Sequence, residues 1–130
     1  MADFRTPLRN ARGFGSAQHG VGHFIAQRVS AVALLGLTSW GVWSALSVAA
    51  GGFEGARAWL GAPVNAALLC LLFVTGFYHA HLGMRVIIED YIARRVTRAA
   101  LMIVNVFVAA GGAGLAVVCV LKVALGGGAV

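Results

Sequence analysis

Charged side chains divide the chain into three long apolar runs. Residues 29–53, 58–84 and 99–121 contain no Asp, Glu, Lys or Arg. A helix that crosses the hydrocarbon core of a membrane needs about 20 apolar residues, and each run is longer than that. The pattern predicts an all-α membrane protein with three transmembrane helices. We expect them at 26–50, 63–91 and 99–125.

Glycine, proline and charged residues mark the segments between these helices. Several glycines interrupt the first part of the chain, which predicts an irregular arm at 1–25. Loops are expected at 51–62 and 92–98, and a short tail at 126–130. Pro63 suits the first turn of the second helix, where a missing N–H group is harmless. The apolar part of a secretory signal is only about 7 to 15 residues long, so the first run is expected to remain in the mature protein as a helix.

Composition supports the membrane class. Of the 130 residues, 60% are hydrophobic and 11% charged, which is far too apolar for a soluble domain of this length. The net charge of +6 would suggest nucleic acid in a soluble protein. Here the basic residues stand at the edges of the apolar runs, where anionic lipid and membrane topology explain them better, so no nucleic-acid partner is expected.

The basic residues also predict an orientation. Eight of the ten Lys and Arg residues lie before the first apolar run or between the second and third. Cytoplasmic segments are enriched in Lys and Arg, so this distribution predicts a cytoplasmic N-terminus and a periplasmic C-terminus in an inner membrane.

One face of the second helix carries a pattern suited to haem. At about 100° per residue, His79, Gly83, Val86 and Asp90 fall on one stripe, while His81 points about 200° away from His79. Imidazole ligates haem iron, and a glycine one turn away lets a flat macrocycle lie against the helix. A hydrogen bond to another helix or a proton path would also use such a histidine. One histidine supplies one axial bond, so this chain would hold half of a six-coordinate site.

Two segments of the chain resemble a known family. From His79 to Tyr91, a glycine follows the histidine by four residues and an Asp-Tyr pair follows it by eleven and twelve. This spacing is similar to the signature of the small hydrophobic membrane-anchor subunit of succinate dehydrogenase, respiratory complex II. Residues 20–31, with Arg28 two positions before Ser30, resemble the start of that subunit's first helix.

The resemblance implies a non-catalytic subunit in a larger enzyme. It would form a helix bundle with a second three-helix anchor, the cytochrome b subunit, and seat a flavoprotein and an iron-sulfur subunit on the cytoplasmic side. FAD and the iron-sulfur clusters would belong to those partners, which pass electrons from succinate to ubiquinone. By position in the motif, His79 is an axial ligand of haem b and Tyr91 donates a hydrogen bond to a quinone carbonyl.

Other polar residues near the cytoplasmic side have less specific expected roles. Asp90 adjoins Tyr91 and could order its phenol or a neighbouring Arg. Arg28 is a candidate partner for a haem propionate, because a guanidinium binds carboxylates with two hydrogen bonds, and His23 is a second candidate. Each of these residues could instead mark a helix end at the membrane interface.

Three alternatives differ in class. A small transporter should carry an acidic residue in mid-membrane, and the apolar runs contain none. A haem-free membrane assembly protein would not require His79 or Tyr91. The anchor of a fumarate reductase would have the same fold and motifs, because the direction of electron flow depends on the quinone and on the partner subunits.

Overall fold

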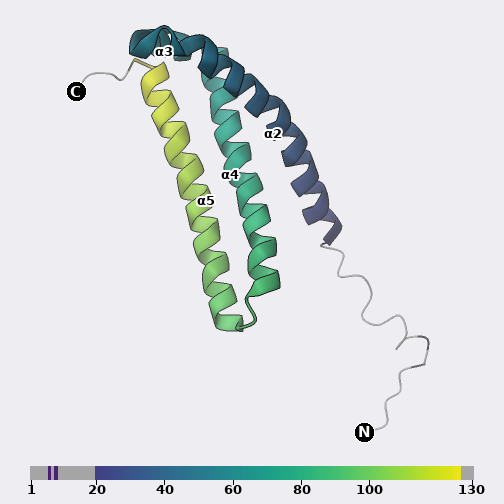
Figure 1. Cartoon of the computed structure of the whole chain (residues 1–130). Helices are drawn as coiled ribbons and strands as arrows, with labels where there is room; N and C mark the ends of the chain where they lie inside the picture. The colour runs from purple at the N-terminus through teal and green to yellow at the C-terminus, as the bar shows by residue number, and fades with distance from the viewer. Residues whose placement is uncertain (1–5, 7, 9–19, 127–130) are drawn as a thin grey trace.

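The computed structural model describes residues 6, 8 and 20–126, and these residues contain four main helices (Figure 1). The helices are α2 (Gly20–Ala49), α3 (Gly52–Leu60), α4 (Pro63–Tyr91) and α5 (Arg95–Ala124). Three of them, α2, α4 and α5, are long and apolar enough to cross a membrane. The described part of the chain contains no strand. The predicted all-α membrane fold with three spans is therefore confirmed.

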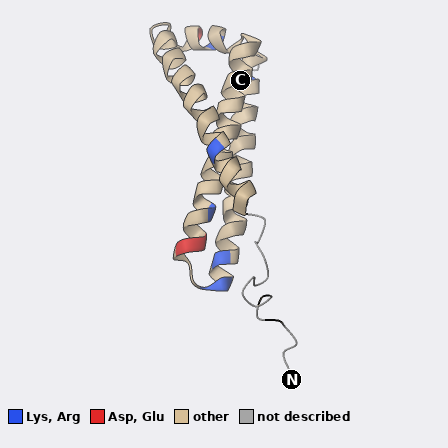
Figure 2. Ribbon diagram, turned by 90° about the vertical axis from the view of Figure 1, so that its right-hand side faces the viewer, with Lys and Arg blue, Asp and Glu red and all other residues tan. Residues whose placement is uncertain are grey.

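The two C-terminal long helices form the most extensive interface. α4 and α5 run antiparallel and side by side, joined by a short turn at one end. α2 packs against α4, and α3 lies across the end of the α4–α5 pair that is opposite the turn (Figures 1 and 2). Charged residues gather at the α4–α5 turn and on α3, and apart from one basic residue of α2 the stretches of helix between them are largely uncharged.

Helix boundaries differ from the expected ones at three places. α2 begins at Gly20, inside the expected arm, and α5 begins at Arg95 rather than at residue 99. The arm was expected to be irregular because of its glycines, but α2 includes Gly20 and Gly22. The third helix was expected to begin after the last charged residue, but α5 continues through Arg95 and Arg98 towards the turn. The expected loop at 51–62 contains α3, which begins at Gly52, whose φ of 58° favours glycine. α4 has the bounds expected for the second helix.

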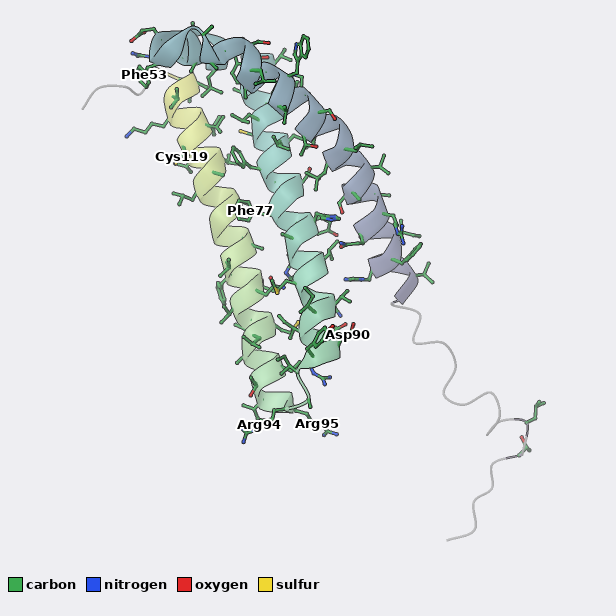
Figure 3. The ribbon with its side chains drawn as sticks, viewed as in Figure 1. Phe53, Phe77, Asp90, Arg94, Arg95 and Cys119 are labelled. Carbon is green, nitrogen blue, oxygen red and sulfur yellow. The ribbon has the colours of Figure 1, made fainter. Side chains whose placement is uncertain are left out.

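A glycine allows α5 to approach α4 closely. A Cβ atom at Gly112 would overlap the ring of Phe77, with its Cζ only 2.7 Å away. Phe77 points from α4 towards α5 (Figure 3). Small residues let membrane helices pack at short distance, and Gly112 has that role here.

Aromatic and amide contacts fix the short helix α3 in place. The rings of Trp40 and Trp59 stack with centroids 5.6 Å apart and an interplanar angle of 29°. At the start of α4, the Asn65 side-chain amide donates to the Trp59 carbonyl over 2.8 Å. These contacts tie α3 to both neighbouring spans.

Few side chains are buried inside the chain. Among the described residues, the buried ones are Ala66, Leu82, Ile88, Val120, Ser30 and Ser44. Most large apolar side chains face outward, as expected for helices surrounded by lipid or by the helices of another membrane subunit.

Candidate functional site

His79 projects from α4 towards α2 and contacts two polar side chains there. Its Nδ1 atom lies 2.9 Å from the hydroxyl oxygen of Ser30. Its Nε2 atom lies 3.4 Å from the amide nitrogen of Gln27. The imidazole is half-buried between the two helices.

The partners of His79 belong to a polar stripe on α2. His23, Gln27 and Ser30 are spaced by four and three residues, so they share one helical face. We call these three residues and His79 the polar seam. Two of its atoms, His23 Nε2 and Gln27 Oε1, are buried without a hydrogen-bond partner among the described residues. No role was predicted for Gln27 or Ser30 from the sequence, although their spacing in an apolar helix was a signal that could have identified them.

Hydrogen bonding within the seam favours one tautomer of His79. The Ser30 hydroxyl donates to the backbone carbonyl of Gln27 over 3.0 Å. A hydroxyl has one proton, so when Ser30 donates to this carbonyl its oxygen accepts from His79, whose imidazole proton is then on Nδ1. The Nε2 atom of His79 then carries a lone pair, which faces the Gln27 amide at the long end of hydrogen-bond distance.

Gly83 lies beside the same amide. A Cβ atom built on Gly83 would be 3.6 Å from the Gln27 amide nitrogen, an ordinary van der Waals contact. Gln27 thus contacts both His79 and the Gly83 position, so these two residues share one face of α4, and that face is turned towards α2. Packing within this chain does not by itself require a glycine at position 83.

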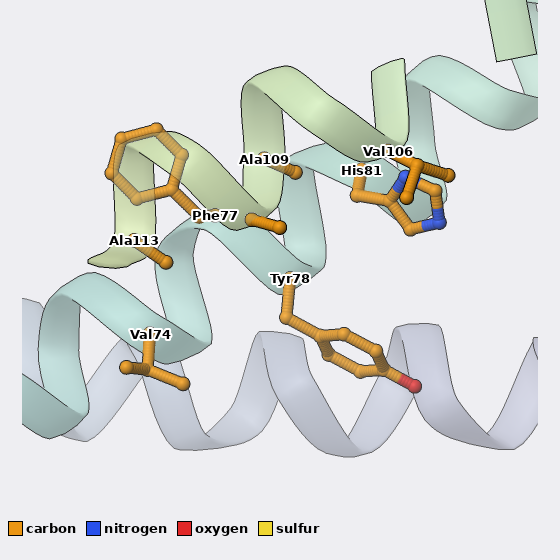
Figure 4. A pocket seen from close by; sticks show the side chains of 8 residues that line it. Val74, Phe77, Tyr78, His81, Val106, Ala109 and Ala113 are labelled. Carbon is orange, nitrogen blue, oxygen red and sulfur yellow. The ribbon is translucent and has the colours of Figure 1, made fainter. Parts of the chain in front are cut away.

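His81 lies on a different side of α4, in a groove between α4 and α5 (Figure 4). The groove has a volume of about 250 Å³ and is otherwise lined by apolar and aromatic side chains, including Tyr78 and Val106. The Nδ1 atom of His81 is buried without a partner in the described part of the chain, and its carbonyl accepts from the Asn105 amide over 3.0 Å. The two histidines of α4 therefore face different helices and cannot meet at one iron.

Tyr91 and Asp90 lie at the end of α4, near the α4–α5 turn (Figure 3). Tyr91 is 82% exposed and borders an apolar groove of about 340 Å³ between α4 and α5. Asp90 is also exposed. Twelve residues of helix separate Tyr91 from His79, or about 18 Å along the axis, so these residues form a second candidate site rather than part of the polar seam.

Arg28 lies beside the seam on the exposed surface of α2. Its guanidinium carbon is 5.0 Å from the centroid of the Phe24 ring. Among the described residues, the one ion pair joins Arg85 and Glu89 at 2.9 Å, and Arg28 does not take part in it.

Comparison with known proteins identifies the class of this chain. Residues 2–124 match the family of succinate dehydrogenase/fumarate reductase transmembrane subunits, and the chain belongs to that family. Within it, the similar relatives are named succinate dehydrogenase hydrophobic membrane anchor subunit. The relative from Rickettsia conorii is 35% identical over 78% of this chain and 82% of its own length. Those from Rickettsia bellii and Paracoccus denitrificans are 35% and 33% identical over the same share of this chain and 81% and 79% of their own lengths. The chain is thus of the membrane-anchor kind, a non-catalytic subunit. No solved structure matches it significantly.

Proposed function

We propose that this chain anchors a succinate dehydrogenase in the membrane, supplies one axial ligand to a haem b through His79, and forms part of a ubiquinone-binding site at Tyr91. The relatives' printed names support the anchoring role. The observation that carries the haem assignment is the setting of His79, whose Nδ1 atom lies 2.9 Å from the Ser30 hydroxyl oxygen while its Nε2 atom faces the Gln27 amide over 3.4 Å.

The donor set of the polar seam fits a haem. A ligating histidine usually donates its second ring N–H to a protein acceptor, and Ser30 supplies that acceptor here. The Gln27 amide in front of Nε2 is held over only 3.4 Å and its oxygen has no described partner, so moving it costs little. A glycine that internal packing does not require leaves that side of α4 without a side chain, which suits the face of a macrocycle.

The remaining residues of this region would hold the edges of the haem. When bound, haem b accepts and releases one electron. Arg28 is exposed, makes no ion pair with a described residue and can offer two parallel N–H donors to a propionate. His23 is half-buried on the same helix, with an Nε2 atom that lacks a described partner, and can offer a second hydrogen bond. A second ligand would come from a partner anchor subunit, because His81 faces the groove between α4 and α5.

The end of α4 suits the second site. Reduction of a quinone takes up two electrons and two protons, so its carbonyl oxygens need a hydrogen-bond donor and a route to water. The Tyr91 phenol is exposed beside an apolar groove that can accommodate a hydrophobic substrate. The neighbouring Asp90 is exposed and can orient the phenol or a basic residue of an adjoining subunit. Other subunits must enclose this site, since the chain itself leaves Tyr91 open.

The same proposal names the partners. The outward-facing apolar helices would pack against a cytochrome b type anchor subunit and lipid. The end of the chain with Asp90 and the α4–α5 turn, where Arg94 and Arg95 lie, would face the cytoplasm. The iron-sulfur subunit, with its clusters, and the flavoprotein subunit, with its FAD, would bind there. Purifying the complex through a tag on this chain should recover all three partner subunits together with a b-type absorption band.

A conservative change at Tyr91 tests the quinone site. Tyr91→Phe removes one hydroxyl and almost no volume, so assembly and haem content should be kept. Loss of one donor from a preorganised site costs about 3 kcal/mol, or roughly a hundredfold in rate. Ubiquinone reduction should fall by that order, while succinate oxidation with an artificial acceptor that takes electrons from the iron-sulfur subunit should stay unchanged. Tyr78→Phe is the matched control and should affect neither assay. Full quinone reduction by Tyr91→Phe in an intact complex would remove Tyr91 from the site.

A further inference from the structure

We infer that Ser30 is a positioning residue for the haem: it orients the His79 imidazole and tunes the reduction potential of the iron. The inference rests on the proposed function, since it requires His79 to be an axial ligand. It concerns a residue on a different helix that would not itself touch the haem.

Ser30 has the burial and the bonding that such a role requires. It is 5% exposed, at the interface of α2 and α4. Its hydroxyl oxygen is 2.9 Å from His79 Nδ1, and its proton goes to the Gln27 carbonyl over 3.0 Å. The imidazole of α4 is thus connected through one hydroxyl to the backbone of α2. This connection orients the ring and favours the tautomer with its proton on Nδ1.

The chemical consequence follows from the direction of the bond. An acceptor on Nδ1–H increases electron density on the imidazole and makes Nε2 a stronger donor to iron. A stronger axial donor stabilises the oxidised iron more than the reduced iron, which lowers the reduction potential. Hydrogen bonding to an axial ligand is one of the ways in which a protein sets the potential of a haem. Removing the Ser30 hydroxyl should therefore raise the midpoint potential without removing the ligand.

The test compares variants of the purified complex by two measurements. One is a redox titration of the b-type band. The other is the electron paramagnetic resonance signal of the oxidised haem, which responds to the orientation of the axial imidazoles. Ser30→Ala should retain the haem, shift the midpoint potential upward and change the resonance signal. Ser30→Thr keeps the hydroxyl and should restore both values. Ser44→Ala removes the other buried serine of α2, fourteen residues away, and should leave both unchanged.

The outcomes separate this inference from the proposed function. A haem-replete Ser30→Ala complex with wild-type potential and signal overturns the role of Ser30, while haem ligation by His79 stands. The proposed function is overturned if the wild-type complex shows no b-type band. It is also overturned if the His79→Ala complex keeps its haem. If Ser30→Ala does not assemble, Ser30→Cys keeps the shape of the side chain, with a slightly larger and much weaker acceptor atom. An upward shift in that variant supports the inference, and an unchanged potential overturns it.

Discussion

Replacing Gly112 by alanine should loosen the packing of α5 on α4. A new Cβ atom would lie 2.7 Å from Cζ of Phe77 and 3.1 Å from its Cδ1, whereas carbon atoms pack best at about 3.5 to 4.0 Å. The ring would have to move by about 1 Å, and forcing extra volume into a packed interface costs about 1 to 3 kcal/mol. Alanine in place of glycine returns about 0.5 to 1 kcal/mol of helix stability. We expect a net loss on the order of 1 kcal/mol.

The assay is the fraction of the purified complex that stays folded across a detergent-denaturant titration. Gly111→Ala is the control, because a Cβ atom there meets nothing within 4 Å, and it should be neutral or slightly stabilising. Combining Gly112→Ala with Phe77→Leu should cancel much of the loss, since residues in contact are not additive. Equal stability of the Gly112→Ala and Gly111→Ala complexes would refute the close contact between Gly112 and Phe77.

The remaining predictions concern orientation and the ends of the molecule. A topology reporter fused after Val130 should register on the periplasmic side, because eight of the ten basic residues lie on segments assigned to the cytoplasmic side. A cytoplasmic signal would contradict the proposed orientation. Trp59→Ala should destabilise the complex in the same titration, since aromatic stacking contributes about 0.5 to 1.5 kcal/mol in addition to the free energy of burying the ring. Trp43→Ala removes a side chain that is 74% exposed and should have a smaller effect. Glu89→Gln should change the stability of the complex by less than about 1 kcal/mol, because the ion pair of Glu89 with Arg85 is about half exposed. A larger loss would show that Glu89 is held by another subunit.

The three spans could be predicted from the sequence because the membrane excludes charge so strongly. A charged side chain in the hydrocarbon core is costly, so the uncharged runs had to coincide with the long apolar helices. α3 was not predicted for a related reason. It is short, contains both Glu54 and Arg57, and begins at the second of two adjacent glycines, features that together are typical of a loop. Its helical form depends on contacts with the spans, such as the stacking of Trp59 on Trp40.

The candidate site was only partly predictable. Helical periodicity is a property of one helix, so the opposite directions of His79 and His81 followed from the sequence alone. The contacts of His79 with Ser30 and Gln27 depend on which face of α2 packs on α4, and on the rotation of both helices. A single sequence does not contain that pairing, although the four- and three-residue spacing of His23, Gln27 and Ser30 marks the polar face. The roles of Arg28, His23, Asp90 and Tyr91 toward bound groups stay predictions.

Ligation of a haem b by His79 is tested most directly by the reduced-minus-oxidised absorption spectrum of the purified complex. The wild-type complex should show a b-type band. His79→Ala should lose most of that band, because the axial bond is removed, while His81→Ala should keep it, since His81 faces the groove between α4 and α5. Both variants should still contain the partner subunits, which a gel of the same sample verifies. A band of wild-type intensity in His79→Ala, or equal loss of the band in both variants, would contradict the assignment.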